Sequence, residues 1–371
     1  MSVQQLPFLE ILQDVSRGNI KTPQKEFLTE GDIPVVDQGK QLIAGYTNDP
    51  ARVCKVTPPV IVFGDHTRAI KFVDFEFAMG ADGTKVLAPR IECDLKYFYH
   101  ALRATRIPDA GYSRHFKFLK ETKLPVPTLS EQKRIAAILD AADALRAKRR
   151  ETLTQLDTLL QSTFLEMFGD PLRNTKGWEM GKVGDLLESA NYGTSKKAHP
   201  EIGAYPVLRM NNITYEGGWN LSELKYIDLT DKEATKHLVH KGQILFNRTN
   251  SKELVGKTAV YRLNKPMAFA GYLVRGVANE HANPEYIGAF MNTPHIKLFL
   301  RSKCKNIVGM ANINAKEFQA IPIPKPPIDL QNRFATIVQS VEQQKSRLRA
   351  HLDELDTLFA SLQARAFAGE L

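Results

Sequence analysis

The sequence predicts an α+β protein made of two mixed α/β domains and two long helices that pair with each other. Three observations carry this prediction. The chain has 371 residues, enough for two ordinary domains with sizeable cores. Two long amphipathic stretches, at 128–168 and 327–371, repeat each other. The segments between them, 1–127 and 169–326, mix strand-like runs with short helices and Gly, Asn and Asp turns.

The two long helices form an internal repeat. Gln132 to Ala136 aligns with Gln331 to Ala335, an offset of 199 residues (331 − 132), and the same offset places Leu156 to Leu159 on the identical Leu355 to Leu358. It also aligns Ser130 with Asp329. Both residue types favour helix N-caps, so we expect the helices to be capped there. A register kept along the whole of each stretch indicates a repeated structural element.

Apolar residues in each stretch are spaced three and four apart, as in a coiled coil. They are Ile135, Ile138, Ala142, Leu145, Leu153, Leu156, Leu160 and Met167 in the first helix, and Phe334, Ile337, Val341, Leu348, Leu352, Leu355, Phe359 and Leu362 in the second. A stripe this narrow needs a partner, and each helix is a suitable partner for the other. The alternative is that each helix packs on its own domain.

Each helix follows a proline-rich stretch, "LPVP" at Leu124 to Pro127 and "IPIPKPP" at Ile321 to Pro327. Proline fixes its own φ, lacks an N–H and disfavours a helical conformation in the residue before it. We therefore expect these stretches to act as joints that end each domain and set the angle at which its helix leaves.

Composition narrows the class of protein. The net charge is +9, which favours a polyanionic partner such as nucleic acid. No apolar run is long enough for a transmembrane helix, and the first residues do not resemble a signal peptide. The three cysteines, Cys54, Cys93 and Cys304, are scattered, which favours a reducing cytoplasm over a disulfide framework.

The globular halves also resemble each other. Pro34 to Gln38 is similar to Pro206 to Met210, and Val62 to Thr67 is similar to Leu245 to Asn250. In both halves a short strand leads into a polar loop, where side chains are displayed. Arg and Lys suit guanine or phosphate, and Asn and Gln suit adenine. The candidate DNA-binding residues are Gln38, Lys40, His66, Arg68, Arg114, His115, Lys117, Thr194, Ser195, Lys196, Lys197, Arg209, Asn211, Asn212, Arg248, Asn250 and Lys252.

With these motifs the sequence resembles the specificity (S) subunits of type I restriction–modification systems. The resemblance rests on "PVLRMNNI" (206–213), "GQILFNRTNSKELVGKTAVY" (242–261), "NINAKEFQAIPIPKPP" (312–327), "IPVVDQGKQLIAGYT" (33–47) and "GYSRHFKFLKETKLPVP" (111–127). It implies two target-recognition domains alternating with two helices that pack antiparallel, with pseudo-twofold symmetry. Each domain would read one half of a bipartite, asymmetric DNA site.

The resemblance also implies partners and cofactors. The S subunit carries no chemistry itself and binds no cofactor or metal. It recruits two methyltransferase subunits, which use S-adenosylmethionine to methylate adenine, and restriction subunits that use ATP and Mg²⁺. The whole complex would act in the cytoplasm.

Two other functions stay open. Asp109, Glu121 and Lys123 mimic the carboxylate pair and lysine of a metal-dependent nuclease. A coiled-coil scaffold without sequence readout is the other alternative, because the paired helices alone would fit it.

Overall fold

The structure is a computed structural model that describes residues 3–109, 111, 113–307 and 310–371. Tyr112, part of one motif quoted above, lies outside these residues. The chain divides into two compact units. Unit 1 comprises Met1–Arg150 and Ala350–Leu371, and unit 2 comprises Glu151–Arg349. Each unit therefore contains one globular domain and one half of each long helix, and the exact boundaries of the four predicted segments stay predictions.

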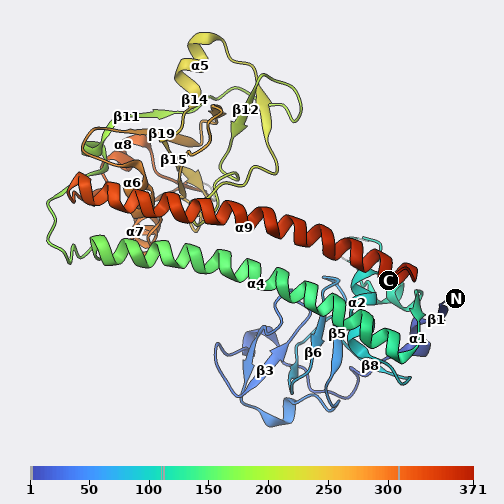
Figure 1. Cartoon of the computed structure of the whole chain (residues 1–371). Helices are drawn as coiled ribbons and strands as arrows, with labels where there is room; N and C mark the ends of the chain where they lie inside the picture. The colour runs from blue at the N-terminus through green and yellow to red at the C-terminus, as the bar shows by residue number, and fades with distance from the viewer. Residues whose placement is uncertain (1–2, 110, 112, 308–309) are drawn as a thin grey trace. The chain divides into compact units, whose positions relative to one another are not determined.

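Unit 1 contains a small domain of short strands and helices (Figure 1). Its elements are β1 (Gln4–Pro7), α1 (Phe8–Ile11), β2 (Leu12–Asp14), β3 (Ile33–Val36), β4 (Gly45–Thr47), β5 (Val60–Gly64), β6 (Ile70–Val73), β7 (Ala78–Met79), β8 (Thr84–Pro89), α2 (Leu95–Ala104), α3 (Phe116–Lys120) and β9 (Lys123–Val126). The strands form sheets in the order β2-β8-β5-β6, β4-β3-β7 and β1-β9. All strand pairs are antiparallel except β3 with β7.

Unit 2 contains a larger domain. Its elements are β10 (Met180–Lys182), β11 (Leu187–Tyr192), β12 (Tyr205–Leu208), β13 (Lys225–Ile227), α5 (Asp231–His237), β14 (Leu238–Val239), β15 (Ile244–Asn247), β16 (Thr249–Asn250), β17 (Thr258–Val260), β18 (Met267–Phe269), β19 (Leu273–Ala278), α6 (Pro284–Asn292), α7 (Pro294–Lys303), β20 (Lys305–Ile307), β21 (Met310–Asn312), α8 (Ala315–Gln319) and β22 (Pro322–Pro324).

The sheets of unit 2 repeat those of unit 1. The order β11-β19-β15-β17 matches β2-β8-β5-β6, and β13-β12-β18 matches β4-β3-β7, including the parallel pair, β12 with β18. Unit 2 adds β14 and the sheet β16-β21-β20. The predicted similarity of the globular halves is therefore a similarity of strand order as well as of sequence.

The proline-rich stretches form edge strands. β9 pairs with β1, and β22 pairs with β10, each in a two-stranded sheet. Proline cannot donate a hydrogen bond to a neighbouring strand and is therefore confined to edges. The prolines thus end each domain with an extended segment that leads directly into a long helix.

The two long helices are α4 (Leu129–Phe168) and α9 (Ile328–Ala368). The predicted N-caps, Ser130 and Asp329, are wrong, because both residues lie inside the first turn. The hydroxyl of Thr128 accepts a hydrogen bond from Glu131 N instead (3.3 Å). In α9 the carbonyl of Pro327 accepts the first helical hydrogen bonds, and proline, which lacks an N–H, suits a helix start.

The helices contact each other antiparallel in both units. In unit 1, Arg146 of α4 pairs with Asp356 of α9 (2.5 Å). In unit 2, Asp157 of α4 pairs with Lys345 of α9 (2.6 Å), and further along α4 the Phe164 ring contacts Phe334 of α9. Residues further along α4 therefore contact residues earlier in α9, as in an antiparallel pair. The offset of 199 carries Arg146 onto Lys345 and Asp157 onto Asp356, so the two ion pairs are equivalent by the repeat.

The ends of the helices also belong to the domain cores. Phe164, Phe168 and Phe334 are buried with Tyr286 of unit 2. In unit 1 the helix residues in the core are Ile135, Ala136, Leu139, Ala142, Phe359 and Ala366. The predicted seam is therefore too narrow. It also included two residues that are exposed, Leu145 and Ile337.

In unit 1 a buried glutamine joins the domain to its helix. Gln132 Oε1 accepts a hydrogen bond from Asp94 N, and Gln132 Nε2 donates to the carbonyl of Pro127, both at 2.9 Å. The hydroxyl of Tyr97 donates to the carbonyl of Pro125 (3.0 Å). These contacts hold the edge strand, the start of α2 and the start of α4 together, and we call them the joint of unit 1.

The joint of unit 2 has the same chemistry. Gln331 Oε1 accepts a hydrogen bond from Asn283 N, and Gln331 Nε2 donates to the carbonyl of Pro326, both at 2.9 Å. The hydroxyl of Tyr286 donates to the carbonyl of Pro324 (2.7 Å). Gln132 and Gln331, which align in the repeat, therefore make equivalent hydrogen bonds in the two units.

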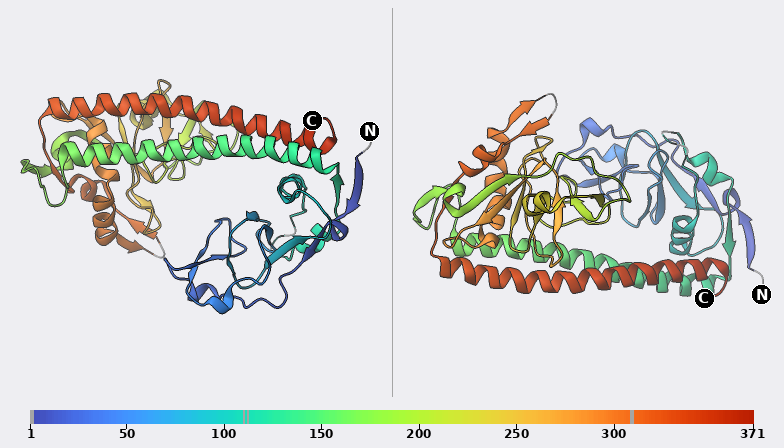
Figure 2. Two further views of the ribbon diagram at one scale, coloured as in Figure 1. Left: turned by 60° about the horizontal axis from the view of Figure 1, so that its bottom comes forward. Right: turned by 90° about the horizontal axis from the view of Figure 1, so that it is seen from above.

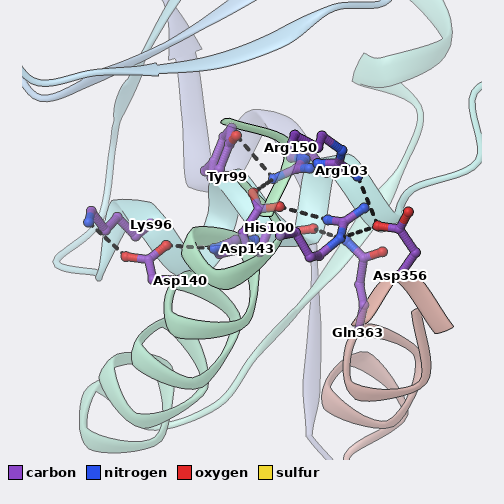
Figure 3. A network of polar contacts seen from close by, with 10 residues as sticks. Lys96, Tyr99, His100, Arg103, Asp140, Asp143, Arg150, Asp356 and Gln363 are labelled. Atoms are coloured by element: carbon purple, nitrogen blue, oxygen red, sulfur yellow. Dashed lines mark hydrogen bonds and ion pairs between the residues drawn. The ribbon is translucent and has the colours of Figure 1, made fainter. Parts of the chain in front are cut away.

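Unit 1 also has a polar network between α2, α4 and α9 (Figure 3). Arg103 pairs with Asp143 (2.6 Å), and buried His100 contacts Asp140 through Nε2 (2.8 Å). Burial lowers the pKa of His100. Burial alone would raise the pKa of Asp143, but the hydrogen bond from Arg103 keeps it below its usual value. The network therefore fixes α2 against the long helices.

The first and last described residues, Val3 and Leu371, also lie in this unit (Figure 2).

Candidate nucleic-acid interface

In unit 1, two loops meet where strands end. The parallel strands β3 and β7 end at the same edge, and Gln38 follows β3. His66 follows β5, and its N–H donates to Gln38 Oε1 (3.3 Å). The Thr67 hydroxyl donates to the carbonyl of Gln38. A side chain at Gly64 would clash with that carbonyl at 2.5 Å, so glycine permits the close approach. We call these loops, 37–40 and 65–68, the loop edge of unit 1.

Three more candidates lie near this edge. Arg68 belongs to it, has a positive φ of 60° and pairs with Asp109 (2.9 Å). His115 N donates to the carbonyl of Asp65 (2.8 Å), which brings its exposed neighbour Arg114 to the same place. Two further candidates, Lys40 and Lys117, are exposed.

In unit 2 the equivalent edge gathers four segments, one of them at Thr194 after β11. Arg209 follows β12, residues 270–272 follow β18, and Arg248 follows β15. Arg248 N donates to the carbonyl of Tyr272 (3.0 Å), and Gly271 N donates to the carbonyl of Thr194 (2.8 Å). The structure therefore brings Arg209, Thr194 and Arg248 to one edge, which we call the loop edge of unit 2.

The guanidinium of Arg248 is held in place before any ligand binds. It lies over the ring of Tyr192, 4.9 Å from the centroid. Its Nη1 donates to the carbonyl of Gly271 (3.3 Å), and Nη2 donates to Asn312 Oδ1 (3.5 Å). Asn250 lies beside it in β16, where it pairs with Ala311. Such an arrangement limits the rotamer freedom that Arg248 would lose on binding a base or a phosphate.

Three candidates are buried and shape the loops. They are His115, Thr194 and Asn212. Asn212 Oδ1 accepts a hydrogen bond from Arg209 N (2.8 Å), and its Nδ2 donates to the carbonyl of Asn220 (2.8 Å). Thr194 Oγ1 accepts from Lys196 N (3.1 Å). The His115 ring contacts the carbonyl of Asp65 through Nδ1 (3.0 Å). These contacts assign the three side chains a structural use in the free protein, and their contact with DNA stays a prediction.

The other candidates of unit 2 are exposed: Ser195, Lys196, Lys197, Asn211 and Lys252. Lys196 is not free, because it pairs with Glu233 (2.6 Å). This hydrogen bond, together with those from Thr230, lowers the pKa of Glu233 to about 2. Sequence reasoning missed Tyr192, Tyr272 and Asn312. Tyr192 ends strand β11 directly before Gly193, but this position alone does not show that its ring lies beside Arg248.

The nuclease alternative requires acidic side chains that together hold a metal ion. Across the residues that the structure describes, no His, Cys, Asp and Glu side chains gather in groups of three or more that could hold a metal ion. Asp109, a member of the nuclease-like set, pairs with Arg68. No helix within the same ranges combines the length and apolar character that a membrane crossing needs.

Comparison with known proteins gives consistent relatives. A family model described as the type I restriction modification DNA specificity domain matches residues 12–155 and 175–355. The specificity subunit of the type I restriction enzyme EcoKI from Escherichia coli (strain K12) is 25% identical over 270 residues, 67% of this chain and 57% of that protein. The EcoR124I/EcoR124II specificity subunit from Escherichia coli is 24% identical over 392 residues, 98% of this chain and 89% of that protein. The match thus spans little more than half of the first relative and most of the second.

Solved structures share the fold. The crystal structure of a type I restriction–modification S subunit from M. genitalium superposes with a TM-score of 0.60 at 16% identity, covering 99% of this chain and 96% of that one. A structure concerning complex assembly and conformational transition of the type I system gives a TM-score of 0.50 at 17% identity, covering all of both chains. The predicted fold class is confirmed. Because the family model covers most of the sequence, the chain belongs to the family of type I restriction modification DNA specificity domains.

Proposed function

We propose that this chain is the sequence-specific DNA-binding subunit of a type I restriction–modification complex, in which each unit reads one half of a bipartite, asymmetric site. The observation that carries the proposal is that one strand order recurs in both units with different polar residues at its loop edge. Gln38 and His66 occupy the edge in unit 1, whereas Arg209 and Arg248 occupy it in unit 2. Different polar groups on one scaffold suit two domains that read different bases.

The relatives support the same function for the whole chain. Two of them are named as specificity subunits of type I restriction enzymes. We propose that the chain recruits two methyltransferase subunits, which use S-adenosylmethionine to methylate adenine, and restriction subunits that use ATP and Mg²⁺. In this proposal the chain has no catalytic residues, binds no cofactor and works in the cytoplasm.

The test is to co-express the chain with its methyltransferase partner in a host without modification systems, and to map methylated adenines across the genome. A bipartite motif that disappears when the chain is omitted is the expected result. Exchanging residues 1–127 for the corresponding domain of a relative should change one half of the motif and leave the other half unchanged. Genomes without any chain-dependent motif would instead support a scaffold.

The nuclease alternative has its own test. Purified protein is incubated with plasmid DNA and Mg²⁺, with the Asp109→Ala variant as the control. The proposal expects no cleavage by either protein. Cleavage by the wild type that is lost in the variant would show a nuclease centre and overturn the non-catalytic assignment.

A further inference from the structure

At each loop edge, a buried lysine donates hydrogen bonds to carbonyls of the loop. In unit 1, Lys71 in β6 is 5% exposed. Its Nζ donates to the carbonyl of Asp37 (2.8 Å) and lies 3.4 Å from Asp37 Oδ1. Asp37 directly precedes Gln38, and its carboxylate accepts a hydrogen bond from Gly39 N (2.8 Å). The ammonium group therefore fixes the first turn of the loop that carries Gln38 and Lys40.

Unit 2 holds its loop with two buried lysines. Lys257 is 7% exposed, and its Nζ donates to the carbonyls of Met210 (2.8 Å) and Ile213 (2.5 Å). These two carbonyls lie on either side of Asn211 and Asn212. Lys297 in α7 donates to the carbonyl of Tyr215 further along the same loop. The loop that starts at Arg209 is therefore fixed at three carbonyls by the side chains of Lys257 and Lys297.

Burial disfavours the charged form of these three lysines. Burial lowers the pKa of Lys71 and of Lys257, and it lowers the pKa of Lys297 to about 8. A buried ammonium is tolerated only when its donors are satisfied. Carbonyls in an irregular loop have no neighbouring strand to pair with, and they are the acceptors that the lysines meet. The lysines thus supply the hydrogen bonds that the loops lack.

The two anchors come from positions that do not correspond in the repeat. Lys71 lies opposite Val62 in the sheet. Val62 aligns with Leu245, whose opposite residue is Ala259. Lys257 instead lies opposite Asn247, which is two residues after Leu245 in β15. The same anchoring is therefore achieved twice from different sites, as expected if the loops themselves require a fixed backbone.

We infer that Lys71 and Lys257 are positioning residues that hold the loop edges in the conformation that reads DNA, so that each lysine sets the base discrimination of one half of the bipartite site. This inference rests on the proposed function. Neither lysine reaches DNA itself, because both ammonium groups point into the protein toward loop carbonyls. Their removal moves the loop backbone and with it the side chains of Gln38 in unit 1 or of Arg209 and Asn211 in unit 2.

The experiment compares Lys71→Met and Lys257→Met in the complex with the methyltransferase partner, by mapping methylated adenines across the host genome. Methionine fills a similar volume but donates no hydrogen bond. Each variant is expected to accept single-base variants in one half of the motif, with about a tenfold loss of discrimination, the size of one lost base contact. The two variants should relax opposite halves.

Two controls separate positioning from stability. Leu102→Ala in α2 and Met291→Ala in α6 remove buried core side chains that donate no hydrogen bond to a loop edge. They are expected to lower the extent of methylation while leaving the motif unchanged. Lysine variants that behave like these controls, that relax the same half, or that leave methylation unaltered would overturn the inference.

A variant that is too unstable to methylate still has an informative counterpart. Lys71→Arg and Lys257→Arg keep a hydrogen-bond donor but require more room, so each should relax the same half of the motif as the corresponding methionine variant. If the methionine variant is inactive and the arginine variant folds but leaves the motif unchanged, that result counts against positioning. A wild-type chain that gives no bipartite motif would refute the proposed function itself, which is a different outcome from relaxed motifs that appear in the wrong half.

Discussion

Replacing Gln331 with alanine is expected to lower the free energy of unfolding of unit 2 by about 3 kcal/mol, because it removes three hydrogen bonds that a buried side chain makes to backbone groups. Gln331 is fully buried and accepts from Asn283 N at 2.9 Å. It donates to the carbonyls of Pro326 (2.9 Å) and His281 (3.3 Å). A buried group left unpaired costs about 1–3 kcal/mol; the buried carbonyl of Pro326 contributes most, and the longer bond to exposed His281 contributes least.

The neighbouring residue provides a matched control. Asn332 is exposed and contacts the same asparagine through its side chain, Asn283 Nδ2 to Asn332 Oδ1 at 2.9 Å. Since water replaces an exposed partner, Asn332→Ala should change stability by no more than about 0.5 kcal/mol. The contrast between adjacent positions separates the buried hydrogen bonds from a general effect of shortening a side chain at the start of α9.

The assay is urea unfolding followed by tryptophan fluorescence. The chain has two tryptophans, Trp178 and Trp219, and both lie in unit 2. Trp178 Nε1 donates to the carbonyl of Phe168 at the end of α4, so it reports on the helix that packs at this joint. With a slope of about 2–3 kcal/mol per molar urea, the midpoint should fall by about 1 M. Equal midpoints for Gln331→Ala and Asn332→Ala would refute the reasoning.

Three further predictions concern the helices and the loop edges. A double-mutant cycle of Lys345→Met and Asp157→Asn, read by the same fluorescence, should give a coupling of about 1 kcal/mol because Lys345 is buried, and a coupling near zero would contradict this. His100→Gln should reduce the loss of thermal stability between pH 7 and about pH 5: burial lowers the pKa of His100, so the unfolded chain gains a proton below its ordinary value of 6.5 that the folded chain resists. Equal losses in wild type and variant would exclude His100 as the cause. Lys197→Ala should reduce the slope of log affinity against log salt by about 1 when the complex binds its mapped site, whereas an unaltered slope would mean that Lys197 contacts no phosphate.

The long helices were predictable because they repeat. An offset of 199 located both elements, and the same offset relates the ion pairs at Arg146 and Lys345. Periodicity could not predict which face is buried near the helix ends. There the domain covers additional residues such as Phe164, while Leu145 in the predicted seam stays exposed. The N-cap predicted at Ser130 is wrong for a local reason: α4 already begins at Leu129, and the Thr128 hydroxyl accepts the hydrogen bond from Glu131 N.

The candidate interface was predictable as loops but not as individual side chains. Polar residues after short strands located both loop edges. Sequence could not separate an asparagine that displays its amide from one that bonds its own loop, and Asn212 is the second kind. Nor could it find Tyr192 and Asn312, because their proximity to Arg248 depends on strand pairing between distant segments.

The joints have a consequence for how much sequence change the chain tolerates. Among the described residues, the side chains of Gln132 and Gln331 bond to main-chain atoms, and Tyr97 and Tyr286 donate to main-chain carbonyls as well. Main-chain atoms are present whatever side chain a position carries. The hydrogen bonds of the joints therefore do not involve the side chains of the loop edges, and mutation of those loops can change binding preferences while these bonds stay in place.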